Sequence, residues 1–326
     1  MPQAAEQLDS SLPIHDNECL IAVETLNIDA ASFSQMDGEA DGDPQKIAER
    51  IRETVRTRGK QHNPVTGSGG MLLGRVKEIG PAFPPRLGLR VGDEIATLVS
   101  LSLTPLHLEE ITAVRRNTDQ VDVRGHAVLF ASGVAVALPA DLPRRTALAV
   151  LDVAGAPIQT ARLVRPGMTV MVVGLGKSGL LCLAQARRSL GGTGRLLGVE
   201  RDPQNLAAIQ RLGLIDDAVV ADATRALEVY QQVERLTRGG LCDLVINTAS
   251  VAGTEMACVL CTREAGKVYF FNMAVSFTAA ALGAEGVGKD VELLIGNGYA
   301  RDHASHALEF VRREPDVRAY LESKFD

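Results

Sequence analysis

Hydrophobic and polar positions follow two different patterns along this chain. In the first 140 residues, short apolar runs bounded by Gly, Pro and Asp predict strands at 19–26, 71–79, 94–103 and 127–138. Between them, apolar residues recur at every fourth position over 44–58, which predicts a helix, and the acidic, glycine-containing stretch 37–43 predicts a loop. This half is therefore expected to form a small β-rich domain.

The second half alternates between strands and helices. A helix is expected over 147–163, ended by Pro166-Gly167, and a terminal helix over 303–325. Between them, strands are expected at 169–173, 195–200, 217–220, 242–246, 267–271 and 291–295, with helices at 178–190, 203–212, 224–238 and 254–263. Such alternation predicts an α/β fold with a doubly wound parallel sheet, the Rossmann arrangement.

A glycine triplet marks the turn after the first of these strands. Gly174 permits a tight turn, Gly176 lets the backbone approach a pyrophosphate, and Gly179 lets the following helix lie close to the strand. The helix N-terminus then offers N–H groups to phosphates. The order of strand, turn, helix, strand and acid predicts a dinucleotide site that includes Lys177 and Ser178, although a glycine-rich turn without a ligand is the alternative.

The acid at the end of the second strand bears on which dinucleotide binds. Glu200 lies 21 residues after Gly179, where a carboxylate can accept from ribose hydroxyls and repel a 2′-phosphate, so NAD is favoured. Arg201 could bind that phosphate, which leaves NADP open. Further cofactor neighbours are expected at the carboxyl ends of two other strands, namely Asn247, Thr248, Asn272 and Met273.

Composition narrows the class of protein. A length of 326 residues suggests two domains, and a net charge of −6 argues against nucleic acid or an anionic membrane as a partner. The start of the chain lacks the pattern of a signal peptide, and no run of 18 apolar residues exists. Five cysteines, an odd number, predict reduced thiols and a cytoplasmic location, and Cys258-x-x-Cys261 alone would make a poor zinc site.

Three short motifs resemble the medium-chain dehydrogenase/reductase superfamily: Gly74-x-Val76-x-x-Ile79-Gly80, Val91-Gly92-Asp93-Glu94-Ile95 and Val164-x-Pro166-Gly167. The resemblance implies a GroES-like β-rich catalytic domain beside the Rossmann domain. We expect the catalytic domain to comprise 1–150 and 300–326, and the dinucleotide-binding domain 151–299.

The zinc ligands of that superfamily are absent from the matching positions. Gly70-Met71 stands where a His-Glu pair is found, Asp29 stands at the first cysteine ligand, and Ala149 and Asp152 lie near the third ligand. Zinc needs three protein ligands of N, S or O type, and two carboxylates alone would hold it poorly. A site without metal is therefore expected.

Longer runs, at 25–33, 63–71, 96–105, 151–157 and 281–290, resemble the L-erythro-3,5-diaminohexanoate dehydrogenase family, whose members carry an extra segment before the equivalent of Pro2. The resemblance implies NAD(P)-dependent oxidative deamination of 3,5-diaminohexanoate at C3 in lysine fermentation, giving 5-amino-3-oxohexanoate and ammonia. The partner would be a small cationic diamino acid.

Carboxylates are the natural ligands of its ammonium groups. Asp29 and Asp152, at the former zinc positions, could hold an ammonium, although Asp29 could equally be a helix N-cap. Glu285 and Lys289, expected in a glycine-rich loop, could bind the second ammonium and the carboxylate, or form a solvated pair.

Hydroxyl groups could orient the water that hydrolyses the iminium. The candidates are Thr66, Ser68, Ser100, Ser102 and Thr104, which could instead satisfy backbone groups in turns. Two other functions remain open: a zinc-free quinone or enoyl reductase that uses NADPH, and a non-catalytic nucleotide-binding redox sensor. The apolar last strand, 291–295, predicts a homodimer joined edge to edge.

Overall fold

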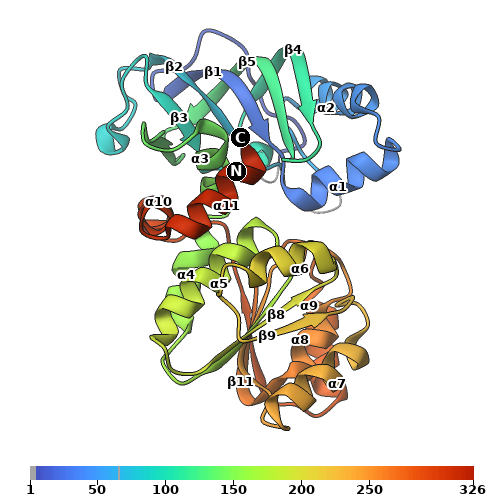
Figure 1. Ribbon diagram of the computed structural model, residues 1–326. Helices are drawn as coiled ribbons and strands as arrows, with labels where there is room; N and C mark the ends of the chain where they lie inside the picture. Colours follow the sequence, from blue (N-terminus) through green and yellow to red (C-terminus); the bar gives the residue numbers. More distant parts are fainter. Residues whose placement is uncertain (1–4, 65–66) are drawn as a thin grey trace. The chain divides into compact units, whose positions relative to one another are not determined.

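A computed structural model describes residues 5–64 and 67–326, and the chain divides into two compact units (Figure 1). The first unit runs to Asp152 and includes 324–326, and the second spans Val153–Ser323. The boundary lies close to the expected position 150. Residues 300–323 were expected in the first unit but belong to the second, because helix α10 (His303–Arg313) packs on α4 (Gly155–Leu163).

An antiparallel sheet forms the first unit. Its order is β4-β5-β1-β2-β3-β6, and its inner face packs Ile21, Leu72 and Val121 into one core. The strands are β1 (Glu18–Asn27), β2 (Met71–Ile79), β3 (Glu94–Thr97), β4 (Leu106–Arg115), β5 (Gln120–Phe130) and β6 (Ala135–Ala137).

The main difference from the sequence pattern is β4, which was not predicted. Two irregularities in its pairing with β5, at Leu108/Glu110 and Ile111/Ala113, break the alternation of apolar and polar residues. The expected strand 94–103 ends at Thr97, before a 3₁₀ turn, η3 (Leu101–Leu103), and 127–138 contains the end of β5 and the separate β6.

Helices α1 (Ala30–Glu39), α2 (Pro44–Arg58) and α3 (Arg144–Asp152) belong to the first unit, with a short 3₁₀ turn, η2 (Pro85–Leu87). Helix α2 confirms the prediction, since Asp43 caps its start and Gly59, in the left-handed region, ends it. The loop expected over 37–43 is wrong in part, because α1 buries Phe33 and Met36 and continues to Glu39.

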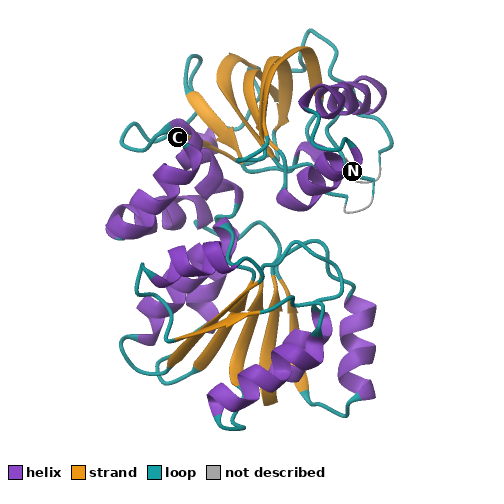
Figure 2. Cartoon of the chain, turned by 45° about the vertical axis from the view of Figure 1, so that its right-hand side comes forward, coloured by secondary structure: helices purple, strands orange, loops and turns teal. Residues whose placement is uncertain are grey.

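The second unit is a parallel sheet with helices on both faces (Figure 2). The strand order is β12-β11-β10-β7-β8-β9, and the direction of this order switches between β10 and β7. In sheets of this type, ligands usually bind at such a switch point. The strands are β7 (Thr169–Val173), β8 (Arg195–Glu200), β9 (Asp217–Val220), β10 (Cys242–Asn247), β11 (Thr262–Phe270) and β12 (Val291–Ile295). The Rossmann prediction is confirmed.

Helices α5 (Lys177–Leu190), α6 (Pro203–Gln210), α7 (Ala226–Thr237), α8 (Glu255–Cys261) and α9 (Phe277–Gly286) connect these strands. Two long helices of the sequence pattern are divided. Residues 147–163 contain the end of α3 and the whole of α4, and 303–325 contains α10 and α11 (Pro315–Phe325), because Pro315 begins a new helix. In the described part of the chain, no helix has the length and apolar character needed to span a membrane.

The cysteines are structural in this fold. All five are free and buried, and Cys258 and Cys261 lie in the core of the second unit. Burial raises the pKa of Cys19 to about 11 and that of Cys182 to about 12. These thiols are therefore protonated near neutral pH and poor nucleophiles.

Candidate functional site: a dinucleotide loop and an acidic helix end

The glycine loop between β7 and α5 has the geometry that its sequence predicts. Gly174 adopts a φ of +79°, and a Cβ there would lie 2.7 Å from the Cα of Ala249. A Cβ at Gly179 would overlap the carbonyl oxygen of Gly174, so the helix lies directly on the turn. Around Gly176, by contrast, an added Cβ meets nothing within 4 Å. The backbone is thus open at the one position where a pyrophosphate must approach.

Side chains from three other elements fix this loop. The Thr248 hydroxyl donates to the Gly174 carbonyl at 2.6 Å, and Glu200 Oε2 accepts from the Leu175 N–H at 2.8 Å. Asn205, in α6, donates from Nδ2 to the Leu175 carbonyl at 3.1 Å. Asn205 was not predicted from the sequence, because an asparagine near the start of a helix belongs to no recognised cofactor-binding motif. The loop is therefore held in shape by protein groups alone.

The remaining predicted cofactor neighbours lie at the same edge of the sheet. Asn247 is fully buried and donates to Thr254 Oγ1 at 2.7 Å, and Asn272 Oδ1 accepts from the Ala274 N–H at 2.9 Å. Met273 is 57% exposed, and Arg201 is exposed directly after β8. Lys177 and Ser178 form the first turn of α5, so the residues at this edge fit a dinucleotide.

Two of the predicted substrate residues lie in the first unit. Asp29 is the N-cap of α1: its Oδ1 accepts from the Ser32 N–H at 3.1 Å and its Oδ2 from the Ser32 hydroxyl. The N-cap interpretation is confirmed, and a contact with substrate stays a prediction. Asp152 is the partly buried last residue of α3.

Gly70 shows why a side chain is missing from the matching histidine position. Its φ is +86°, and a Cβ would overlap the carbonyl oxygen of Asn27 at the end of β1. A ligand side chain cannot be placed there unless the backbone moves. Within residues 5–64 and 67–326, no three His, Cys, Asp or Glu residues are grouped so that they could hold a metal ion. A metal-free reaction remains a prediction.

Two of the candidate hydroxyls, those of Ser100 and Thr104, satisfy backbone groups. Ser100 Oγ accepts from the Gly69 N–H at 3.1 Å and from the Ser102 N–H at 3.3 Å, and Thr104 donates to the Ser100 carbonyl at 3.1 Å. Ser68 accepts from the Asn63 N–H through its carbonyl at 2.8 Å. Thr66 lies outside the described residues. The turn interpretation therefore accounts for Ser100 and Thr104.

The expected loop position of Glu285 is wrong. Glu285 lies in the last turn of α9, and Lys289, just after it, donates to the Leu260 carbonyl at 2.6 Å. Because α9 runs from the carboxyl edge of the sheet back to the start of β12, both residues lie at the amino edge. They are thus at the opposite edge from Gly176, so we assign them no part in substrate binding.

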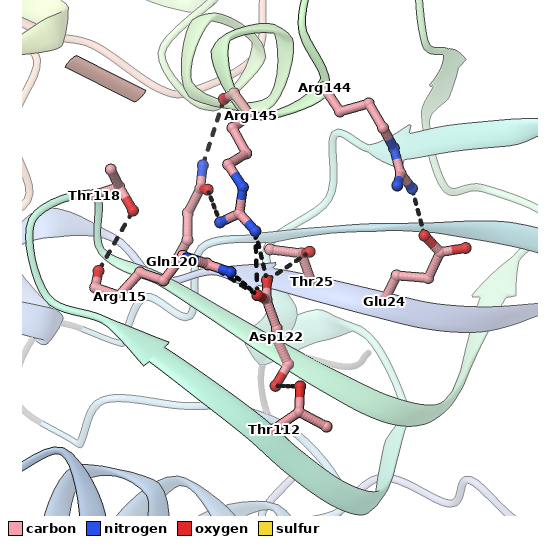
Figure 3. A network of polar contacts seen from close by, with 9 residues as sticks. All are labelled: Glu24, Thr25, Thr112, Arg115, Thr118, Gln120, Asp122, Arg144 and Arg145. Atoms are coloured by element: carbon pink, nitrogen blue, oxygen red, sulfur yellow. Dashed lines mark hydrogen bonds and ion pairs between the residues drawn. The ribbon is translucent and has the colours of Figure 1, made fainter. Parts of the chain in front are cut away.

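A polar network fixes the start of the helix that ends in Asp152 (Figure 3). Asp122 in β5 accepts from Arg145 of α3 at 3.1 Å, from Arg115 of β4 at 2.9 Å and from Thr25 of β1 at 3.2 Å. Burial alone raises the pKa of Asp122, but the two guanidinium groups outweigh it and leave the pKa below its usual value. Helix α3 is therefore attached to β5 at a carboxylate that also binds β4 and β1.

Comparison with known proteins identifies the family. Residues 1–139 match the family model described as "L-erythro-3,5-diaminohexanoate dehydrogenase N-terminal domain". The L-erythro-3,5-diaminohexanoate dehydrogenase of Acetoanaerobium sticklandii is 47% identical over 326 residues, which cover all of this chain and 95% of that protein. The chain belongs to the L-erythro-3,5-diaminohexanoate dehydrogenase family. The family member from Fusobacterium nucleatum is also 47% identical, over 98% of this chain and 92% of its own.

Membership of this family makes the chain an oxidoreductase. Solved structures agree on the fold. An alcohol dehydrogenase of Thermotoga maritima superposes with a TM-score of 0.59 at 16% identity, covering 96% of this chain and 86% of its own. The expected fold, a Rossmann sheet together with a β-rich unit, is thereby confirmed.

Proposed function

We propose that the chain catalyses the NAD(P)-dependent oxidative deamination of 3,5-diaminohexanoate at C3 in lysine fermentation, in which water supplies the ketone oxygen and the products are 5-amino-3-oxohexanoate, ammonia and the reduced cofactor. The observation that carries this proposal is the 47% identity over the full chain to two dehydrogenases named for this substrate. The fixed glycine loop with an open Gly176 supports it independently, because an amine dehydrogenase needs a bound hydride acceptor. A bound nicotinamide would supply that acceptor.

Removal of hydride from C3 requires a neutral amine, since an ammonium has no lone pair to assist. The pKa values of an amine and a carboxylate ordinarily differ by about six units. Burial would raise the pKa of the acid and a neighbouring charge would lower that of the amine, which together would close part of that gap. We assign Asp152 to hold the ammonium and take its proton, because it is a partly buried carboxylate at the end of α3, near the position of a zinc ligand in the superfamily that the chain resembles.

We infer a preference for NAD over NADP. Glu200 ends β8 and holds the glycine loop directly, which supports the expectation that its carboxylate accepts from the hydroxyls of an adenosine ribose. A 2′-phosphate would be repelled there, unless the exposed Arg201 compensates. The alternative function, an NADPH-dependent quinone or enoyl reductase, has less support than diamino acid oxidation, because both curated relatives are named for the latter.

We also propose that the enzyme is cytoplasmic and works without zinc on a small cationic substrate, without nucleic acid or membrane partners. Five free, buried thiols and a net charge of −6 support this environment and these partners. Elemental analysis of protein purified without added metal tests the zinc proposal. About one zinc per chain, lost together with activity, would contradict it.

A homodimer joined through β12 is the proposed assembly. This strand lies at the edge of the parallel sheet, and Ile295 on it is 63% exposed. Leu282 in α9 and Val287 directly after that helix are also exposed, and sheet edges of this kind are usually paired or covered. Light scattering at micromolar concentration should give twice the chain mass of 34.7 kDa. A monomer mass would contradict this assembly.

The central experiment measures NADH and ammonia formed from L-erythro-3,5-diaminohexanoate and NAD, with NADP in parallel. We expect equal amounts of both products. The matched control replaces the substrate with a 5-amino acid that lacks the C3 amine, which should give no NADH. Binding of NAD without turnover of the diamino acid would instead favour the redox-sensor alternative.

A further inference from the structure

The Glu200 carboxylate is already saturated with hydrogen bonds. Its Oε2 accepts from the Leu175 N–H at 2.8 Å and from Asn205 Nδ2 at 3.2 Å, and its Oε1 accepts from the N–H groups of Arg201 and Asp202 at 2.8 and 3.0 Å. A carboxylate has about four acceptor sites. An adenosine ribose that donates its hydroxyls to Glu200 must therefore displace or share one of these donors.

Asn205 is the donor whose hydrogen bond to Glu200 can be displaced by a ribose hydroxyl. The other three are backbone N–H groups of the loop and of the turn after β8, and they cannot leave without unfolding that turn. Asn205 donates from a side chain, over the longest of the four distances. Its amide stays close to the carboxylate, because Nδ2 also donates to the Leu175 carbonyl at 3.1 Å.

The oxygen of the same amide is held by the C-terminal helix. Tyr320 of α11 donates its hydroxyl to Asn205 Oδ1 at 3.0 Å, across 115 residues of sequence. Both side chains are partly buried, and both belong to the second unit. The Glu200 carboxylate and the Leu175 carbonyl both accept, so the NH₂ end of the Asn205 amide faces them, and the Tyr320 hydroxyl donates to the oxygen at the other end and thereby holds the amide in this orientation.

We propose that Tyr320 is a positioning residue for cofactor choice, acting through Asn205 on the Glu200 carboxylate. With Tyr320 in place, the Asn205 NH₂ group faces Glu200 and can move from the carboxylate to a ribose hydroxyl oxygen. An unphosphorylated ribose would bind more tightly, because it gains the hydrogen bond from Asn205. A 2′-phosphorylated ribose would gain little affinity, because its phosphate cannot approach the carboxylate closely. Helix α11 therefore contributes to the preference for NAD over NADP.

This inference rests on the proposed nicotinamide dinucleotide site, and direct binding tests it without turnover. Calorimetry would measure the dissociation constants of NAD and NADP for the full chain and for Tyr320→Phe, which removes only the hydroxyl. We expect the dissociation constant for NAD to rise about three- to tenfold, the loss of roughly one hydrogen bond, and that for NADP to change less than twofold. The ratio of the two constants is a readout that a purely structural role would leave unchanged.

Tyr230→Phe is the matched control, because Tyr230 in α7 donates to Glu234 at 2.7 Å and touches neither Asn205 nor Glu200 in the hydrogen bonds described. It should leave both constants unchanged. Asn205→Ala should reproduce the selective loss, and the double variant should bind like Asn205→Ala alone if Tyr320 acts through that amide. Asn205→Ala keeps the inference falsifiable if Tyr320→Phe does not fold, because an equal loss of affinity for both dinucleotides would exclude the amide through which Tyr320 is proposed to act.

Additive losses in the double variant, or equal losses for both dinucleotides in Tyr320→Phe, would overturn the role of Tyr320. If the wild-type chain binds neither dinucleotide, the proposed function and this inference both fail. If it binds them with the expected selectivity but oxidises no diamino acid, only the proposed function fails.

Discussion

The candidate residues of the two units differ in the structural roles that they already have. In the second unit, the glycine loop is fixed from several sides by Thr248, Glu200 and Asn205, and Gly176 is left open. In the first unit, Asp29 caps a helix and Ser100 satisfies two backbone N–H groups, so these groups already have structural partners. A cofactor site can be built from backbone shape, whereas a substrate site depends on individual side chains whose roles must be separated by experiment.

The largest effect is expected from Asp152→Asn. The carboxamide keeps the shape but removes the charge and the basicity, so turnover should fall by about 10²–10⁴-fold. Steady-state kinetics would measure it, with NAD binding as the control that should stay unchanged. Near-normal turnover would remove Asp152 from the mechanism and show that the first unit contributes no essential acid at this position.

Glu200→Ala should come next, because it removes a ribose acceptor and a phosphate repeller together. We expect the binding free energy of NAD to weaken by about 1–3 kcal/mol, and that of NADP by less. Calorimetric titration with both dinucleotides measures the difference. Equal losses would show that Glu200 acts only as the support of Leu175 and does not contact the ribose.

Gly176→Ala tests the open position of the loop directly. The new methyl group meets no protein atom within 4 Å, so the melting temperature should stay the same, while NAD affinity should fall roughly tenfold, about 1.4 kcal/mol. Gly179→Ala is the contrasting variant, because its Cβ overlaps the Gly174 carbonyl oxygen and should lower the melting temperature. Unchanged affinity in Gly176→Ala would place the dinucleotide elsewhere.

Asp122→Asn should lower the free energy of unfolding at pH 7 by about 1 kcal/mol, because the ion pairs with Arg115 and Arg145 are lost. The pKa of Asp122 is lowered in the folded chain, so its contribution is present above the unfolded value of about 3.9 and is lost as the pH falls through the folded value. Denaturant unfolding at pH 7 and pH 3 should therefore show a difference from wild type that shrinks at the lower pH. A difference independent of pH would contradict this origin.

Asp29→Asn should have the smallest effect on stability, a few tenths of a kcal/mol, because asparagine caps a helix nearly as well as aspartate. Asp29→Ala, the matched variant, should cost about 1 kcal/mol in denaturant unfolding. Since Asn preserves the cap, its turnover reports on substrate binding alone. A fall comparable to that of Asp152→Asn would place Asp29 at the substrate, and wild-type turnover would leave it as a cap.

The sequence predicted the second unit better than the first, and the reason is physical. Buried parallel strands are continuous apolar runs, and the glycine spacing has one geometric solution, so β7, the loop and Glu200 are found at their predicted positions. In the first unit, β4 could not be predicted, because two irregularities in its pairing with β5 break the alternation of apolar and polar residues.

Contacts between residues distant in sequence could not be predicted from a single chain. The bond from Tyr320 to Asn205 joins residues 115 positions apart, and Asp122 with Arg145 joins a strand to a helix. The misplaced Glu285 has a related cause: its glycine-rich surroundings suggested a loop, yet they form the end of α9 at the amino edge.

The turn at Gly70 has a consequence for the evolution and redesign of this enzyme. Because its backbone is in the left-handed region and lies against the end of β1, no single codon change can install a histidine there without rebuilding the segment that leads into β2. A zinc-dependent ancestor and this chain would be separated by a change of main-chain path, which neither point mutation nor metal supplementation reverses. Attempts to graft alcohol dehydrogenase chemistry onto this scaffold should therefore begin with the loop and only then with its ligands.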